Sequence, residues 1–169
     1  MSDQDIETPT TQLPLPEGIR IRQALPSDAE AIHVLLRPYV MQRLLLSRTE
    51  PEIIELTRHG FVAEYAKDNR HRLVGFSAVE IYSPKIAELQ CLAVDRPFQG
   101  SGVGRALVGY CVERAKALNI MEILAISSSE SFLKSCGFDY ALPDQKKALF
   151  CQLRPREHGE GETQNIEQE

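Results

Sequence analysis

A glycine-rich stretch in the middle of the chain is the first feature whose residue types and spacing suggest chemistry. Gly100, Gly102 and Gly104 fall within five residues, directly after the apolar run ELQCLAV and directly before an amphipathic run. The first N–H groups of a helix have no acceptor inside the helix, and the helix dipole adds partial positive charge there. Because glycines let an anion approach those amides closely, this strand-to-helix junction predicts a phosphate-binding loop.

Two common phosphate-binding loops are excluded by the residues that follow the glycines. The Walker loop requires Lys after its last glycine, whereas Arg105 follows Gly104. The dinucleotide-binding fingerprint requires a small residue three positions after its second glycine, and Gly102 is followed there by Arg105. The pattern that remains is Q-x-x-G-x-G, formed by Gln99, Gly102 and Gly104.

This pattern, placed directly behind a strand, resembles the acetyl-CoA signature of the GNAT family of N-acetyltransferases. In that family the loop amides hold the pyrophosphate of coenzyme A, and the preceding strand carries the acyl-pantetheine arm. The resemblance implies acetyl-CoA as the co-substrate, with no metal ion. It also implies a set of cofactor-binding residues in the strand and the loop: Leu92, Ala93, Val94, Gln99, Gly100, Ser101, Gly102, Val103, Gly104 and Arg105.

The elements that must position this loop are of mixed α and β type. Apolar alternation predicts strands, and recurrence at helical spacing predicts helices, the first of which starts with a capping box formed by Ser27 and Glu30. The order resembles the GNAT fold, which implies a single α/β domain with a mixed, mostly antiparallel sheet flanked by helices. The predicted strands cover 18–24, 61–65, 73–82, 88–94, 121–127 and 146–153, and the predicted helices 27–43, 51–59, 103–118 and 130–136.

Charge divides the chain into a basic body and two acidic ends. Residues 1–17 and 157–169 hold nine Asp and Glu and no Lys or Arg, so the net charge of −5 becomes +4 for residues 18–156. The sequence therefore predicts an acetyltransferase domain at 18–156 between two disordered tails, the second of them acidic. A mildly basic body is compatible with a polyanionic cofactor. Nucleic-acid binding is not indicated, since there is no Trp and only 7% of the residues are aromatic.

Length and composition exclude several other classes. A chain of 169 residues with 43% apolar residues can bury one core, and no apolar run reaches membrane-spanning length. The four Cys and four His show no metal-ligand spacing, so we expect neither a zinc site nor a disulfide framework. The sequence thus predicts a cytoplasmic enzyme with a small-molecule partner and no membrane or nucleic-acid partner; a homodimer remains open.

Across residues 19–157 the resemblance extends to the acetyltransferase domain of the N-acetylglutamate synthases, amino-acid N-acetyltransferases that open arginine biosynthesis. Three segments carry it: LLRPYVMQRLLLSRT, AELQCLAVDRPFQGSGVG and LPDQKKALFCQLR. The implied acceptor is glutamate or a related amino acid. Its carboxylates would be bound by Arg48 and Arg154, whose planar fork suits such groups, with Lys147 as a lesser option.

Departures from this pattern fall near the implied acceptor pocket. Ser128 stands where the synthases have Arg after the fifth strand, and Phe150 and Cys151 replace a Tyr-Asn pair on the last strand. An acceptor other than glutamate therefore stays open. The alternatives are acetylation of a peptide, protein or xenobiotic amine, or a catalytically weak CoA-binding module. Paired acidic side chains in the acceptor cleft would favour a polyamine or lysine, whereas paired arginines would favour an acidic amino acid.

Acetyl transfer to an amine requires a base, because free amines are mostly protonated at neutral pH. Glu88 lies eleven residues before Gln99, where many members of the GNAT family place a catalytic glutamate. Strand alternation predicts that Glu88 shares a face with Gln90, Leu92 and Val94. We expect Glu88 to be the catalytic base of a direct transfer that forms no acyl-enzyme.

Overall fold

The computed structural model describes residues 14–67 and 70–140 and contains one mixed sheet. The sheet order is β1 (Ile19–Gln23), β2 (Gly60–Lys67), β3 (Arg70–Ser83), β4 (Ile86–Val94) and β5 (Glu122–Leu124). Neighbours from β1 to β4 are antiparallel, and only β5 is parallel to β4. The predicted mixed, mostly antiparallel sheet is confirmed. The predicted last strand at 146–153 lies outside the described residues, as do most of both predicted tails, so the domain boundaries remain predictions.

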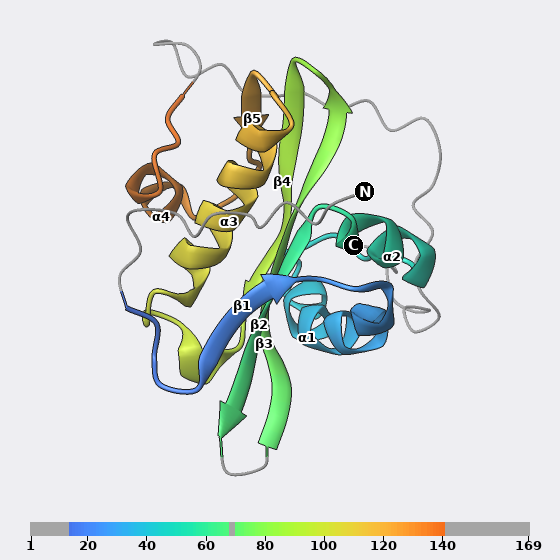
Figure 1. The fold of residues 1–169 in the computed structure, drawn as a ribbon, viewed down its shortest axis with the longest axis vertical. Helices are drawn as coiled ribbons and strands as arrows, with labels where there is room; N and C mark the ends of the chain where they lie inside the picture. The colour runs from blue at the N-terminus through green and yellow to red at the C-terminus, as the bar shows by residue number, and fades with distance from the viewer. Residues whose placement is uncertain (1–13, 68–69, 141–169) are drawn as a thin grey trace, which may run out of the picture.

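Helices cover both faces of the sheet (Figure 1). On one face α1 (Ala29–Met41) and α2 (Glu50–Thr57) bury Ile32, Ile53 and Phe76 in a shared apolar cluster. On the other face α3 (Val103–Ala117) and α4 (Glu130–Ser135) pack against the sheet, with residues such as Leu107 and Leu133 in a second cluster. The single α/β domain with flanking helices is therefore as predicted.

The start of α1 differs from the prediction. The expected capping box between Ser27 and Glu30 does not form, because a short 3₁₀ turn, Pro26–Asp28, precedes the helix. In this turn the N–H of Leu25 donates to the carboxylate of Asp28 at 2.8 Å, so Asp28 closes the turn and α1 begins one residue later. Local competition between Ser27 and Asp28 thus decides the helix start.

A β-bulge in β4 corrects the predicted alternation of that strand. Ala78 pairs with Gln90 and Phe76 pairs with Ala93, so β4 has one residue more than β3 between these pairs, and Cys91 has φ +55°. The extra residue reverses which face the following side chains point to. Leu89, before the bulge, and Leu92, after it, both pack toward α3. The prediction that Glu88 and Gln90 share a face with Leu92 and Val94 is therefore wrong.

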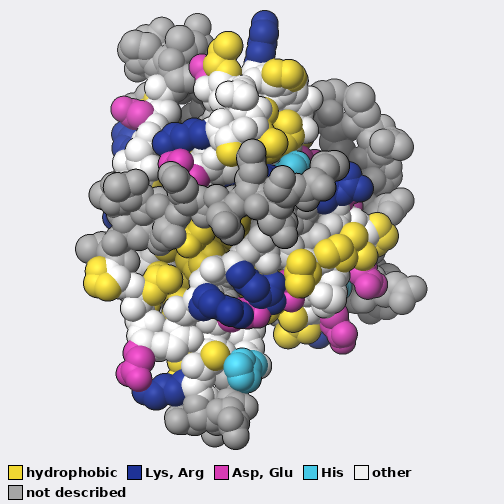
Figure 2. All heavy atoms as spheres, in the orientation of Figure 1, with side chains coloured by type: hydrophobic (Ala, Val, Ile, Leu, Met, Phe, Trp, Pro, Cys, Tyr) yellow, Lys and Arg dark blue, Asp and Glu magenta, His cyan; other side chains and the backbone are white. Residues whose placement is uncertain are grey.

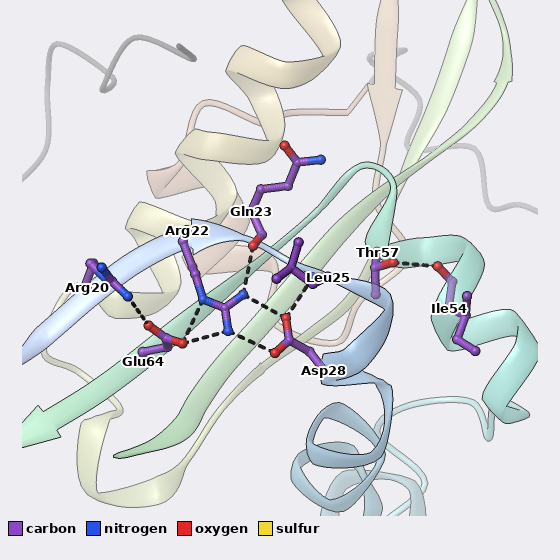
Figure 3. Close-up of polar contacts among 8 residues, drawn as sticks. All are labelled: Arg20, Arg22, Gln23, Leu25, Asp28, Ile54, Thr57 and Glu64. Atoms are coloured by element: carbon purple, nitrogen blue, oxygen red, sulfur yellow. Dashed lines mark hydrogen bonds and ion pairs between the residues drawn. The ribbon is translucent and has the colours of Figure 1, made fainter. Parts of the chain in front are cut away.

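A charged network ties the edge of the sheet to the turn before α1 (Figure 3). Arg22 donates to Glu64 at 2.7 Å and, through both terminal nitrogens, to Asp28 at 2.8 and 2.9 Å. Arg20 adds a further bond to Glu64 at 2.7 Å. Basic and acidic side chains accordingly lie side by side on this face, over β1 and β2 (Figure 2). The Arg22 hydrogen bonds hold the pKa of Asp28 and that of Glu64 below their ordinary values.

This network predicts an acid-sensitive contribution to stability. Because folding lowers both carboxyl pKa values, the contribution is complete above the pH at which unfolded Asp and Glu ionise, about 4, and is lost as the pH falls through the folded-state values. Arg22→Met is expected to lower the free energy of unfolding at pH 7 by roughly 2 kcal/mol. The difference from wild type should shrink below pH 4, as urea denaturation at several pH values would measure.

Arg20→Met is the matched control, because its side chain is 74% exposed against 26% for Arg22. An exposed ion pair contributes less than about 1 kcal/mol, so this variant should resemble wild type. An equal loss of unfolding free energy in the two variants would contradict this role of Arg22. So would a loss from Arg22→Met that does not vary with pH.

Candidate active site

A cavity of about 600 Å³ lies where β4 and β5 separate. The two strands pair only from Ile86 with Glu122 to Glu88 with Leu124, which makes β5 shorter than the predicted 121–127. Beyond Glu88 the edge of β4 that faces β5 has no strand partner in the described residues. The walls come from the loop after α1, from β3 and β4, and from the segment between β5 and α4: Arg43–Leu46, Arg48, Glu80, Tyr82, Glu88–Leu92, Ala125–Ser127, Ser129, Phe132 and Leu133.

The glycine loop before α3 has the geometry of an anion-binding turn. Gly100 and Gly102 have φ of +74° and +91°, conformations that side chains other than glycine rarely adopt. A Cβ atom on either would meet nothing within 4 Å, so space is open above the loop. The first helical hydrogen bond of α3 runs from Ala106 to Gly102 at 3.0 Å. The amides of residues 103–105 therefore precede the helical ladder and can donate to a bound phosphate.

Polar side chains predicted to bind the cofactor hold this loop in place. Gln99 donates to the carbonyl of Val94 at 2.8 Å and to the hydroxyl of Tyr39 at 3.0 Å, which links the loop to β4 and α1. Ser101 donates to the carbonyl of Phe98 at 2.5 Å. Arg105 donates to the backbone and side chain of Ser135, which links α3 to α4.

The remaining predicted cofactor residues differ in their access to the cavity. Leu92 lines it, whereas Ala93 packs in the cluster beneath α1, and Val103, the first residue of α3, is fully buried in the cluster between α3 and the sheet. Gly104 faces α4, since a Cβ there would lie 3.5 Å from Phe132, an ordinary contact. The backbone of the loop, more than its side chains, is what this geometry offers to a ligand.

One wall of the cavity, which we call the acceptor wall after its predicted role, is a hydrogen-bonded chain of the polar side chains of Arg48, Glu80, Tyr82, Glu88 and Gln90. The hydroxyl of Tyr82 donates to Glu88 at 2.5 Å. The amide of Gln90 donates to Glu80 at 3.2 Å and accepts from Arg48 at 2.9 Å. Glu88 and Arg48, which lie 40 residues apart in the sequence, are thus brought to one wall, as their predicted roles require.

Two pKa shifts describe the electrostatics of this wall. Partial burial, and then the hydrogen bond to Glu88, raise the pKa of Tyr82, so its hydroxyl stays protonated and donates at neutral pH. Burial also raises the pKa of the Cys91 thiol, with Arg48 opposing the shift. A protonated thiol is a poor nucleophile, so this cysteine is not suited to carry an acyl group.

Several residues of this wall did not emerge from the sequence. Glu80, Tyr82 and Gln90 line the cavity, and Tyr39 anchors the loop. The short turn at Pro84 and Lys85 indicates a hairpin, but a regular two-residue hairpin would set Glu80 opposite Leu89; the register shift between Ile81 and Ser83 sets it opposite Glu88 instead, so the sequence carried no signal for this pair. Lys147 and Arg154, predicted to bind the acceptor, lie outside the described residues.

The described residues hold no group of three or more His, Cys, Asp or Glu side chains that could bind a metal ion. In the same part of the chain, no helix has the length and apolar character needed to cross a membrane.

The amino-acid sequence of this chain is similar to those of known N-acetyltransferases. The model of the acetyltransferase (GNAT) family matches residues 29–138. An uncharacterized N-acetyltransferase of Chlorobaculum tepidum is 32% identical over 122 residues, which cover 70% of this chain and 74% of that protein. The amino-acid acetyltransferase of Pasteurella multocida is 28% identical over 144 residues, or 81% of this chain. The match spans only 32% of the length of the Pasteurella enzyme.

Solved structures agree with the fold and with a coenzyme A site. The protein Rv2747 of Mycobacterium tuberculosis, in complex with CoA and NLQ, superposes with a TM-score of 0.66 at 26% identity, covering 73% of each chain. N-acetylglutamate synthase of Neisseria gonorrhoeae, complexed with coenzyme A and N-acetyl-glutamate, gives a TM-score of 0.60 at 26% identity. That match covers 69% of this chain and 27% of the synthase.

Proposed function

The chain belongs to the GNAT family and is an acetyl-CoA-dependent N-acetyltransferase, and we propose that its acceptor is the amine of a small amino acid, glutamate or a close relative. One observation carries the proposal: Glu88 and Arg48 lie on one wall of a cavity that opens at the separation of β4 and β5. The relatives named amino-acid acetyltransferases support it. A place in amino-acid metabolism, at the opening of arginine biosynthesis, is part of the same proposal, as is a cytoplasmic location.

The co-substrate supplies an acetyl thioester, and this chain's backbone would hold it. The loop has φ of +74° at Gly100 and +91° at Gly102, and the amides of residues 103–105, which precede the helical ladder of α3, would donate to a pyrophosphate. The edge of β4 beyond Glu88 would take the pantetheine arm, because its amides and carbonyls have no strand partner in the described residues. Gln99, Ser101 and Arg105 would act by keeping this loop in shape.

We assign Glu88 the role of general base. The amine nitrogen bonds to the acetyl carbon, the carbon–sulfur bond breaks, coenzyme A leaves as a thiolate, and the proton of the amine passes to Glu88. Tyr82, at 2.5 Å, would position the carboxylate and leave its second oxygen free to accept that proton. Burial raises the pKa of the Cys91 thiol, which disfavours its thiolate and so supports direct transfer without an acyl-enzyme.

Arg48 would bind the carboxylate of the amino acid. Its Nε is buried and has no hydrogen-bond partner among the described residues, and an unsatisfied buried donor is uncommon without a ligand. Its terminal nitrogens reach Gln90 at 2.9 Å and Glu52 at 3.8 Å, which holds the guanidinium against the cavity wall. Arg154 and Lys147 remain predictions from the resemblance.

Arg48→Ala is expected to raise the KM for the amino-acid acceptor at least tenfold. A hydrogen bond to a charged group contributes about 1.5–3 kcal/mol, and about 1.4 kcal/mol corresponds to a factor of ten. The KM for acetyl-CoA should not change, because Arg48 lies on the acceptor wall. Thiol release followed at varied acceptor concentration measures both constants.

Arg58→Ala is the matched control. It removes the same charge from the end of α2, where the side chain is 70% exposed and pairs only with Glu55 among the described residues. Its acceptor KM should equal that of wild type. An unchanged acceptor KM in Arg48→Ala would show that another residue binds the carboxylate. Thiol release with peptides, proteins or xenobiotic amines but with no free amino acid would refute the proposed acceptor and favour that alternative.

A further inference from the structure

Two carboxylates face each other across the hairpin that forms the acceptor wall. Glu80 of β3 and Glu88 of β4 are direct register partners, and both line the cavity. They lie before the bulge at Cys91, on the face of the sheet that Arg48 also borders. Only Glu88 has a role in the transfer proposed above, so Glu80 requires a separate explanation.

Neutral donors, not cations, satisfy these carboxylates within the described residues. Tyr82 donates to Glu88 at 2.5 Å and approaches Glu80 at 3.4 Å, and Gln90 donates to Glu80 at 3.2 Å. Arg48 is bonded to this network through Gln90, and its guanidinium forms an ion pair with Glu52 at 3.8 Å rather than with Glu80 or Glu88. Like charges directly opposite on neighbouring strands are destabilising, so this wall favours a ligand that brings hydrogen-bond donors.

Three residues of this wall, Arg48, Glu88 and Glu80, would each contact a different group of a bound amino acid. On the proposed function, its α-carboxylate would pair with Arg48 and its amine would meet Glu88, which leaves its side chain as the group that can face Glu80. A side-chain carboxylate in that position would add a third negative charge to the pair. An N–H group would instead donate to Glu80.

We propose that Glu80 determines acceptor specificity and selects amino acids whose side chain ends in an N–H donor, an amide or an ammonium, over acidic ones. This inference rests on the proposed function, because it takes an amino acid as the acceptor. It narrows that function by disfavouring glutamate itself. Selection of this kind combines attraction of the correct side chain with repulsion of the wrong one.

The test compares kcat/KM for glutamate, glutamine and ornithine in thiol-release assays of the purified protein. Wild type should prefer glutamine or ornithine to glutamate by at least tenfold. Glu80→Gln, which keeps the shape but removes the charge, should shift this ratio toward glutamate at least tenfold, with the KM for acetyl-CoA unchanged. A preference for glutamine identifies the amide form of the donor, and a preference for ornithine identifies the ammonium form.

Glu122→Gln is the charge-matched control, because Glu122 is exposed at the start of β5 and does not line the cavity. The ratio of its kcat/KM values for glutamine or ornithine and for glutamate should equal that of wild type. A wild type that prefers glutamate, or an unchanged ratio in Glu80→Gln, overturns the role of Glu80 while the proposed function stands. If none of the three amino acids is acetylated although acetyl-CoA binds, the proposed function fails and this inference falls with it. Should Glu80→Gln not fold, the wild-type preference decides.

Discussion

Glu88→Gln is expected to lower kcat roughly a hundredfold, the lower end of what a general base contributes. Glutamine keeps the size of the side chain and can still accept the hydrogen bond from Tyr82, which lies 2.5 Å from the carboxylate, but it cannot take the proton of the amine. The KM for acetyl-CoA should hardly change. The acidic limb of the pH profile of kcat should disappear, leaving only the titration of the amine, as thiol release measured across pH would show.

Tyr82→Phe separates the base from the residue that positions it. This variant removes the hydroxyl that donates to Glu88 but keeps the carboxylate, so kcat should fall less than in Glu88→Gln and the acidic limb should remain. Full turnover and an unchanged pH profile in Glu88→Gln would make Glu88 structural. The proton would then leave through a different residue.

Gly102→Val is expected to weaken acetyl-CoA binding at least a hundredfold. Gly102 has φ +91°, and a β-branched residue there forces the loop out of the conformation that aligns the amides. Each hydrogen bond to a charged group contributes about 1.5–3 kcal/mol, so the loss of two exceeds a factor of a hundred. Calorimetric titration with coenzyme A measures the affinity, and circular dichroism checks that the variant is folded.

Gly137→Val is the control for backbone strain alone. Gly137 also has φ +91° and open space around its Cβ position, but it follows α4 and is not part of the loop before α3. This variant should lose a similar amount of stability and keep its affinity for coenzyme A. A folded Gly102→Val protein that binds coenzyme A as wild type does would rule out the loop as the pyrophosphate site.

The sequence determined the features that depend on near neighbours along the chain. Helical periodicity located α1, α2 and α3, and apolar alternation located β2 and β3. The glycine spacing predicted the turn before α3, because the positive φ at Gly100 and Gly102 is a local requirement that only glycine meets easily. Where two local signals competed, as at Ser27 and Asp28, the prediction of the cap was wrong.

Only the tertiary structure decided how the acceptor wall is composed. Nothing in the run ELQCLAV marks Cys91 as a bulge, since the extra residue is defined only against the partner strand β3. The same pairing sets Glu80 opposite Glu88, and the return of the chain after α1 brings Arg48 to Gln90, 42 residues away.

Gln99 gives the clearest case of a local motif whose role is decided at long range. The sequence marked it as part of a cofactor signature, whereas its side chain meets Tyr39, 60 residues away, and the carbonyl of Val94. The face that a strand residue occupies, and the partner that a side chain finds, depend on the register and packing of distant segments. Register and packing are properties of the assembled sheet, and the neighbouring residues in the sequence do not determine them.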